Sequence, residues 1–130
     1  MAGGANHSRL TNIVYPNGRQ IDYNYASGID NTISRLSSIS DSSATLEGYT
    51  CLGLSTVVTR AHAESGIELS YIKLTGESNG DAGDKYTGLD RFNRIADQRW
   101  LDGTTSVDRY KYGHDRNSNR LYRENLLDAA

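Results

Sequence analysis

One stretch of the sequence, residues 86–125, reads YTGLDRFNRIADQRWLDGTTSVDRYKYGHDRNSNRLYREN and contains one short unit twice. In each copy a tyrosine opens a short strand, a polar turn follows, and an arginine with an aliphatic neighbour opens the next strand. The first copy leads from Tyr86 to Arg94, and the second leads from Tyr112 to Arg120. The unit therefore predicts a β-hairpin that occurs twice in succession.

The same unit recurs at a fixed spacing elsewhere in the chain. The step along the sequence from Arg94 to Arg120 is equal to the step from Arg9 to Arg35. A fixed period of this kind is typical of repeat proteins, in which one unit is too small to bury its apolar face alone. We therefore expect a chain of successive, similar hairpins.

The composition favours sheets that have one face in water. The chain of 130 residues contains 36% hydrophobic residues, with nine tyrosines against one Phe and one Trp. Tyrosine suits strands because its ring packs while its hydroxyl group reaches water. Thirteen glycines and one proline indicate many turns. The length fits one domain or a piece of one.

Charge and cysteine content disfavour several classes of protein. The formal net charge of −2 gives no overall positive field that would attract nucleic acid or an anionic membrane. Cys51 is the single cysteine, so no internal disulfide is expected. Residues 1–8 lack the pattern of a signal peptide, and no run is long and apolar enough to span a membrane. Because the chain starts inside the repeat pattern, we expect a segment of a longer protein.

The clearest hairpin lies near the start of the chain. Residues 10–15 read as a strand, and residues 16–18 (Pro-Asn-Gly) form a turn. Residues 19–25 then alternate, with Ile21 and two tyrosines on one face and polar residues on the other. Two such runs joined by Asn-Gly are the strongest short-range signal for a hairpin.

Further short runs extend this pattern along the chain. Helical periodicity is absent from them, and eight or nine strands at regular spacing predict an all-β fold of consecutive antiparallel hairpins that form a coiling sheet. The other strands are expected at 35–40, 45–52, 56–63, 67–75, 94–101, 106–112 and 120–123, with polar loops at 26–32 and 76–85, the second one mobile. The hairpin repeats are expected at about 9–34, 35–63, 67–93 and 94–123, followed by a tail at 124–130 that is too short for an isolated helix.

These units resemble the RHS/YD-repeat family, the bacterial RHS repeat-associated proteins that are related to toxin-complex shells and teneurin YD shells. The family's unit is similar to Tyr-x-Tyr-Asp, a few polar residues with Gly or Asn, and then Arg-Leu. The copy at 110–121 matches best. It departs from the family at Gly113 and His114, which separate its second tyrosine from Asp115.

The resemblance covers nearly the whole chain. The copy at 86–95 has Gly88 in place of the second tyrosine. Residues 23–36 contain a third copy, and residues 49–54 contain a degenerate fourth. Residues 9–19 resemble the strand-turn-strand that joins the family's repeats.

The resemblance implies a structural role without chemistry of its own. In the family, hairpins join edge to edge into a long sheet that closes into a hollow shell around a toxic C-terminal polypeptide, or that forms part of a large surface protein. The expected partners are therefore neighbouring YD repeats and an enclosed C-terminal toxin polypeptide, in a secreted or cell-surface parent. The chain lacks the family's Asp-Pro-x-Gly-Leu motif, so no self-cleaving protease role carries over.

The repeat residues are expected to act in the packing of one hairpin on the next. Tyrosine rings stack between adjacent hairpins, and the Asp of the following turn accepts bonds from backbone N–H groups. Arg94 and Arg120 are expected to bind Asp90 and Asp115 or their neighbours. The repeat-motif residues are Arg9, Leu10, Tyr23, Tyr25, Arg35, Leu36, Tyr49, Tyr86, Asp90, Arg94, Ile95, Tyr110, Tyr112, Asp115, Arg120 and Leu121.

Metal sites are disfavoured by the residue spacing. His7, His62 and His114 are scattered and have no partner at metal-ligand spacing. Residues 115–119 open like a calcium loop but lack its glycine and its closing glutamate, and residues 80–84 are a single Gly-Asp element without tandem copies. No metal and no cofactor is therefore expected.

Two functions compete with the structural reading. No catalytic motif is present, and Cys51 reads as a small buried apolar residue, so an enzyme is disfavoured. A carbohydrate- or protein-binding cell-surface module is the alternative, since exposed tyrosines and Trp100 can stack on a sugar, and Asn6 starts a glycosylation signal. The isolated chain is also expected to self-associate through its sheet edges.

Overall fold

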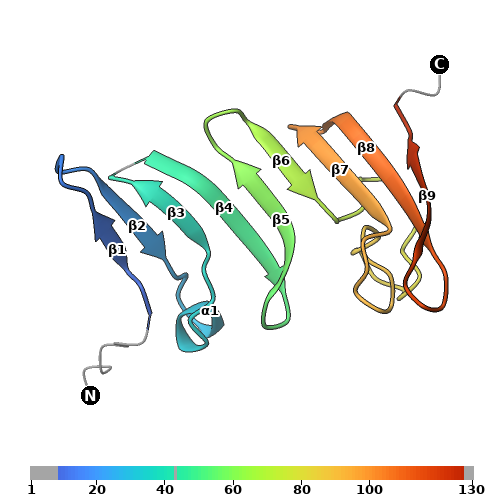
Figure 1. The fold of residues 1–130 in the computed structure, drawn as a ribbon, viewed down its shortest axis with the longest axis horizontal. Coiled ribbons are helices and arrows are strands. Elements are labelled where there is room, and N and C mark those ends of the chain that lie inside the picture. Colours follow the sequence, from blue (N-terminus) through green and yellow to red (C-terminus); the bar gives the residue numbers. More distant parts are fainter. Residues whose placement is uncertain (1–8, 43, 128–130) are drawn as a thin grey trace.

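The computed structural model describes residues 9–42 and 44–127, which form a single antiparallel sheet of nine strands (Figure 1). The strands lie side by side in chain order, and the sheet stays open. This confirms the all-β fold of consecutive antiparallel strands. The strands are β1 (Asn12–Val14), β2 (Gln20–Asn24), β3 (Ser38–Asp41), β4 (Ala44–Leu52), β5 (Thr56–His62), β6 (Ile67–Ser70), β7 (Asp97–Asp102), β8 (Thr105–His114) and β9 (Arg120–Asn125).

The hairpin of β1 and β2 forms where Pro-Asn-Gly predicts it. The Gly18 N–H donates to the Tyr15 carbonyl oxygen at 2.9 Å, and the Tyr15 N–H donates to the Arg19 carbonyl oxygen at 2.8 Å. Gly18 has φ of 84°, a left-handed conformation that costs glycine little. The Asn17 side chain accepts a bond from the Arg19 N–H at 3.1 Å and so fixes the same turn.

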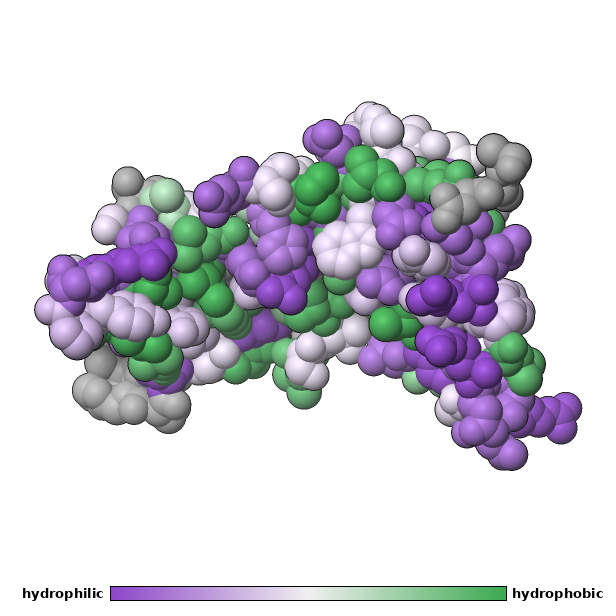
Figure 2. All heavy atoms as spheres, turned by 45° about the horizontal axis from the view of Figure 1, so that its top comes forward, coloured by the Kyte–Doolittle hydropathy of each residue, from purple (hydrophilic) through white to green (hydrophobic). Residues whose placement is uncertain are grey.

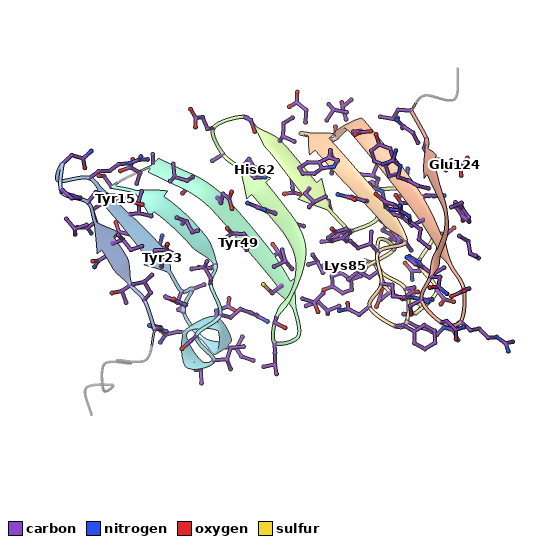
Figure 3. All side chains as sticks on the ribbon, viewed as in Figure 1. Tyr15, Tyr23, Tyr49, His62, Lys85 and Glu124 are labelled. Carbon is purple, nitrogen blue, oxygen red and sulfur yellow. The ribbon has the colours of Figure 1, made fainter. Side chains whose placement is uncertain are left out.

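The strand register divides the sheet into two chemically different faces. Residues directly opposite each other in an antiparallel pair lie on the same face, and the pairs place Tyr23, Ile39, Glu47, His62 and Ile67 in one row across β2 to β6. Figure 3 shows Tyr23, Tyr49 and His62 along this part of the sheet. One face, called the apolar face, carries Ile13, Ile21, Tyr23, Ile39, Tyr49, Ile67, Leu69, Trp100, Tyr110 and Tyr112 together with Glu47, Arg60, His62, Gln98 and Asp108. The other, called the polar face, carries Asn12, Asp22, Asn24, Ser38, Thr50, Thr59, Ser70, Asp97, Arg99, Arg109 and Lys111 together with Ala61 and Leu101.

A single layer of strands leaves many apolar side chains partly in water. Figure 2 shows hydrophobic atoms at the surface in several patches between hydrophilic ones. Within the described residues, the fully buried side chains are those of Val58 and Arg99, with less than 2% exposed. A sheet can bury little area until a second layer covers it.

The segment 71–96, which links β6 to β7, supplies part of such a second layer. It lies at the lower end of β7, β8 and β9 (Figure 1). The Lys73 N–H donates to the Lys85 carbonyl oxygen at 2.9 Å, and the Gly80 N–H donates to the Asp84 carbonyl oxygen at 3.0 Å. The predicted loop at 76–85 is therefore without strands but is bonded internally.

Three sequence predictions for this region are wrong. Tyr86 begins a turn and not a strand, since the copy at 86–95 forms one isolated bridge between Leu89 and Ile95. The stretch 67–93 consequently holds one strand, β6, and not a hairpin. The strand expected from Arg94 begins three residues later, at the start of β7.

A short helix, α1 (Ile29–Thr32), replaces part of the polar loop predicted at 26–32. The Thr32 N–H and side-chain hydroxyl both donate to the Gly28 carbonyl oxygen, at 3.1 Å and 3.0 Å, and the Ile33 N–H donates to the Ile29 carbonyl oxygen at 2.9 Å. One turn is too short to give a periodic apolar pattern, which is why the sequence does not reveal it.

The C-terminal part of the chain differs slightly from its prediction. Strand β9 runs to Asn125, so the first two residues of the predicted tail at 124–130 are strand. The rest of that tail from 128, and the predictions for Asn6 and His7, lie outside the described residues.

Candidate functional site

The turn at 90–94 is held by one aspartate. The Asp90 carboxylate accepts bonds from the N–H groups of Phe92 and Arg94, each at 2.9 Å, and binds the Arg94 guanidinium at 2.6 Å. Desolvation alone raises the pKa of Asp90, but these hydrogen bonds and the charge of Arg94 outweigh it and lower the pKa overall. The predicted pairing of Arg94 with Asp90 is therefore confirmed.

The turn at 115–119 has the same construction. The Asp115 carboxylate accepts bonds from the N–H groups of Asn117 and Asn119, each at 2.8 Å, and from the Asn119 side-chain amide at 2.9 Å. These bonds occupy both carboxylate oxygens and lower the pKa of Asp115. The Asp115 carboxylate therefore holds the turn at 115–119 in the way that Asp90 holds the turn at 90–94.

The hydrogen bonds of these two turns correct the repeat period. Asp90 corresponds to Asp115, because in both turns the N–H of the Asp donates to the carbonyl oxygen four residues later, at 2.9 Å and 3.0 Å. Arg94 therefore corresponds to Asn119, and not to Arg120 as the sequence pattern predicts. For these two turns the structure gives the step from Asp90 to Asp115, which is shorter by one position than the step from Arg94 to Arg120. The expected bond from Arg120 to Asp115 is accordingly made by Asn119.

The first hairpin contains the same turn a third time. Tyr15 and Arg19 exchange the backbone bond that Asp90 and Arg94 exchange, and Gly18 has positive φ like its counterpart Asn93 (φ 61°). In all three turns the last residue of the loop is left-handed, namely Gly18, Asn93 and Ser118. The turn at 15–19 joins β1 to β2 and lies at the opposite end of the strands from the turn at 115–119, which joins β8 to β9, so the shared bonds indicate a common type of turn and not a further copy in the repeat period.

The tyrosines of the motif contact cations, and the predicted stacking of tyrosine rings between hairpins is not the arrangement observed. The ring–ring contact observed among the described residues joins His62 and Trp100, with centroids 6.4 Å apart. Tyrosine rings instead lie under positive groups, which bind the negative face of the ring. These pairs are Arg9 with Tyr25 at 4.2 Å, Lys85 with Tyr86 at 5.4 Å, Arg120 with Tyr112 at 6.0 Å and Arg123 with Tyr110 at 5.0 Å.

The remaining motif residues are spread along the sheet and do not converge on one site. Arg9 binds Asn31 at 2.6 Å, and Arg35 binds Asp30 at 2.5 Å, so both arginines attach α1 to the segments that precede β1 and β3. Burial, followed by the bond that its hydroxyl donates to Glu47, raises the pKa of Tyr49 to about 12. Leu10, Ile95 and Leu121 are exposed, and Tyr23 and Leu36 are half-buried.

The strongest convergence of charge lies elsewhere, beneath the segment 71–96. Arg99 on β7 is 1% exposed and donates to Asp97 at 3.0 Å and to Glu77 at 2.9 Å. Arg109 on β8 binds the same two carboxylates, at 2.6 Å and 2.9 Å. We call these four residues the charge cluster.

The segment 71–96 completes the cluster with uncharged acceptors. Arg99 also donates to the Ile72 carbonyl oxygen at 2.7 Å and to the Thr87 hydroxyl at 3.1 Å. Glu77 in turn accepts the N–H of Leu74 at 2.8 Å. The cluster therefore binds one segment, from Ile72 to Thr87, onto the polar face of β7 and β8.

The pKa shifts in the cluster follow from its burial and its opposite charges. Burial lowers the pKa of Arg99, while the hydrogen bond to Asp97 raises the pKa of Arg109. Burial alone raises the pKa of Glu77, but the Leu74 N–H and the two arginines lower it overall. Two cations and two anions compensate one another, which a buried charge requires.

Gly88 allows the segment to approach the sheet. A Cβ atom at this position would lie 2.5 Å from the Tyr71 Cα atom and would also meet the Asp97 carbonyl oxygen. The Gly88 N–H donates to the Tyr71 carbonyl oxygen at 2.8 Å. Only glycine permits such an approach of two backbones, so Gly88 is a packing residue and not a degenerate tyrosine position.

The cluster borders a shallow depression of about 600 Å³. Arg109, Lys111 and Tyr122 line one side, and residues 76–80 line the other. No group of three or more His, Cys, Asp or Glu residues that could hold a metal occurs in the described parts of the chain. Because its ionised groups are bound to one another, the cluster can stabilise the attachment of the segment 71–96 to β7 and β8.

Sequence reasoning missed this cluster. Asp97 and Arg99 alternate with Gln98 and Trp100 in the way that solvent-facing residues do, so the pattern alone favours a wet face. The available signal was that two opposite charges, two residues apart, lie on the same side of a strand. Recognising their burial required the position of the segment 71–96.

Comparisons with known proteins do not assign the chain to a family. No protein-family model matches it, and no curated protein matches it significantly. Within the residues that the structure describes, no helix has the length and apolar character needed to cross a membrane.

Proposed function

We propose that this chain is a structural segment of an RHS-type YD-repeat wall, which with further repeats forms a β-shell around a C-terminal polypeptide or presents it at the cell surface. The observation that carries the proposal is the sheet itself. Its nine strands pair in chain order, without a crossover, and both edge strands remain available for a further strand. Such a sheet can be extended by adding hairpins, as a repeat architecture requires.

The recurrence of one turn supports the proposal. Turns at 90–94 and 115–119 share their backbone hydrogen bonds and an aspartate that accepts two backbone N–H groups of the turn, and they are separated by the step from Asp90 to Asp115. Repeats of this kind gain stability from contacts with their neighbours. The charge cluster supports a structural role as well, since its ionised groups hold the segment 71–96 to the sheet.

Electron microscopy of the protein encoded by the complete reading frame that contains this chain tests the proposal. The expected result is a hollow β-shell in which this chain occupies part of the wall. A solid globular particle, or a reading frame that adds no further repeats to this chain, would count against it.

A further inference from the structure

A depression of about 600 Å³ lies on the polar face of the sheet, between strands β7 to β9 and residues 76–80. In the register of β8 and β9, Gly113 lies opposite Tyr122, and Lys111 lies on the same face two positions before Gly113. A further hairpin would pair with the backbone of β9 in the plane of the sheet, and it would therefore lie beside the depression and leave it open.

The lining of the depression carries three cations against two anions. The cations are Arg99, Arg109 and Lys111, and the anions are Glu77 and Asp97. Both oxygens of each carboxylate are already bonded to the two arginines. Lys111 is half-buried, and within the described residues it forms neither an ion pair nor a hydrogen bond. One positive charge of the lining is therefore left without a counter-ion.

The polar groups that remain unbonded in this lining are mainly donors. Arg109 uses Nε and Nη2 to bind its carboxylates, which leaves Nη1 without a partner in the described structure. The buried Nε of Arg99 has no acceptor among the described residues either. Glu124 is opposite Lys111 in the ladder, but it is not part of the lining and forms no ion pair with Lys111 in the described chain. Surplus donors with a positive charge suit a phosphate, whose oxygens accept hydrogen bonds from arginine and lysine.

Tyr122 supplies an aromatic surface at the border of the depression. A Cβ atom on Gly113 would coincide with ring atoms of Tyr122, so the ring lies over the Gly113 backbone in the place of a side chain. Tyr122 nevertheless remains 54% exposed. An exposed aromatic ring that is held against a sheet can stack on a nucleobase. Gly113 is one of the two residues at which this chain departs from the repeat pattern, and the packing of Tyr122 gives that departure a role.

We propose that the depression binds a nucleoside monophosphate. The base stacks on Tyr122, and the phosphate accepts hydrogen bonds from the Lys111 ammonium and from Nη1 of Arg109. A sugar ring without a phosphate fits less well, because its hydroxyl groups need acceptors and the carboxylates of the lining are already bonded to arginines. The volume lies in the range of small-molecule sites. The proposal does not depend on the proposed wall, since all of these groups lie within this chain.

Isothermal titration calorimetry of the full 130-residue chain with adenosine monophosphate (AMP) tests the proposal. Adenosine, which lacks the phosphate, and inorganic phosphate, which lacks the base, are titrated separately. AMP should bind at least about tenfold more tightly than either of them, because stacking and charge-assisted hydrogen bonds both contribute.

Variants of the chain assign the two halves of the ligand. Lys111→Gln should weaken AMP about tenfold and leave adenosine unchanged, whereas Lys111→Arg should keep AMP binding. Tyr122→Leu should weaken AMP and adenosine by the same factor, whereas Tyr122→Phe should keep both. Arg123→Gln removes a positive charge from the opposite face of β9, so it is the matched control and should change nothing. Circular dichroism verifies that each variant keeps its sheet.

Four outcomes would overturn the proposal. Absence of measurable binding of millimolar AMP to the folded chain would contradict it outright. Inorganic phosphate that binds as tightly as AMP would show that the ring of Tyr122 takes no part. An equal loss in Lys111→Gln and Arg123→Gln would show general attraction of anions. Tighter binding of glucuronic acid than of AMP, lost in Lys111→Gln, would assign the depression to an acidic sugar.

Discussion

The two ends of the sheet use the same strand order but are stabilised differently. In β1 to β5 the buried side chains are those of Ile21 and Val58. From β6 to β9, a larger set of residues is buried, and two of its members, Asp97 and Arg99, form hydrogen bonds with the segment 71–96. This set consists of Ser70, Leu89, Asp97, Arg99 and Leu101. A single layer of hairpins therefore buries little by itself, and one folded-back connection creates a local core.

The ion pairs show the same difference. Arg19 and Asp41 form a pair in which the side chains are 53% and 29% exposed, and Arg60 binds Glu47 in a similar setting. In the charge cluster, the side chains of Arg99 and Asp97 are 1% and 7% exposed. Exposed pairs contribute little, but removal of one partner from a buried pair leaves an unpaired buried charge. The two ends should therefore respond very differently to the loss of a charge.

The largest effect is expected for Arg99→Met. The substitution leaves Asp97 and Glu77 with one cation fewer in a buried site, and a loss of about 3–5 kcal/mol in the free energy of unfolding is typical for such a change. Chemical denaturation monitored by circular dichroism measures it. Arg91→Met is the matched control, because Arg91 binds Asp81 in an exposed pair, and its unfolding curve should be close to that of the parent chain.

A smaller loss is expected for Gly88→Ala. The added methyl group meets the backbone at Tyr71 and Asp97, and overpacking of this kind costs about 1–3 kcal/mol. Gly48→Ala on β4 is the control, since nothing lies within 4 Å of its Cβ position. Equal melting temperatures for both variants would show that the segment 71–96 does not lie closely on the sheet.

A third comparison separates the two repeat arginines. The sequence pattern alone predicts that Arg94→Ala and Arg120→Ala both lower the melting temperature. In the structure Arg94 binds Asp90 at 2.6 Å, whereas in the turn at 115–119 the equivalent bond to Asp115 comes from Asn119 and not from Arg120. Arg94→Ala should therefore lower the free energy of unfolding by about 1–2 kcal/mol, and Arg120→Ala should lower it by less than about 0.5 kcal/mol. Thermal melts of both variants measure this. A loss for Arg120→Ala as large as that for Arg94→Ala would favour the longer period, in which the two arginines are equivalent.

The smallest effects are expected from single carboxylates at low pH. The hydrogen bond from Arg60 lowers the pKa of Glu47, and the pKa of Glu77 is lowered overall despite its burial. A carboxyl group with a lowered folded-state pKa stabilises the fold above its ordinary pKa and loses this contribution as the pH falls through the folded-state pKa. Melting temperatures should therefore fall below about pH 4.5, the ordinary value for Glu. Glu47→Gln and Glu77→Gln should each flatten this dependence, and an unchanged pH profile in both would contradict the pairing.

The parts of the fold that are predictable are those with local signals. Pro-Asn-Gly at 16–18 places the first hairpin, and the strands expected at 45–52, 56–63 and 106–112 lie close to the observed ranges of β4, β5 and β8. Helix α1 is missed because one turn has no period. The turns at 90–94 and 115–119 are recognisable as equivalent, but the sequence pattern aligns Arg94 with Arg120, whereas the structure aligns it with Asn119. Sequence alone does not indicate which residue follows the left-handed position.

The charge cluster could not be predicted in the same way. Its four members come from the segment 71–96 and from two strands. The alternation of residues in β7 predicts a solvent-exposed polar face, and only the position of the segment 71–96 shows that this face is buried. The side of the sheet on which a long connection lies is decided by packing between residues distant in sequence. Gly88 carries the relevant information, but its role depends on the backbone of Tyr71, which the sequence does not place next to it.

Residue-resolved amide hydrogen exchange of the full chain tests the central claim most directly, namely that one open meander is stabilised mainly where the segment 71–96 covers it. Exchange should be slowest for the backbone-bonded amides of β7 and β8 and fastest for those of β1 and β2, because local opening requires less free energy where few side chains are buried. Protection of β1 and β2 equal to that of β7 and β8 would contradict the account.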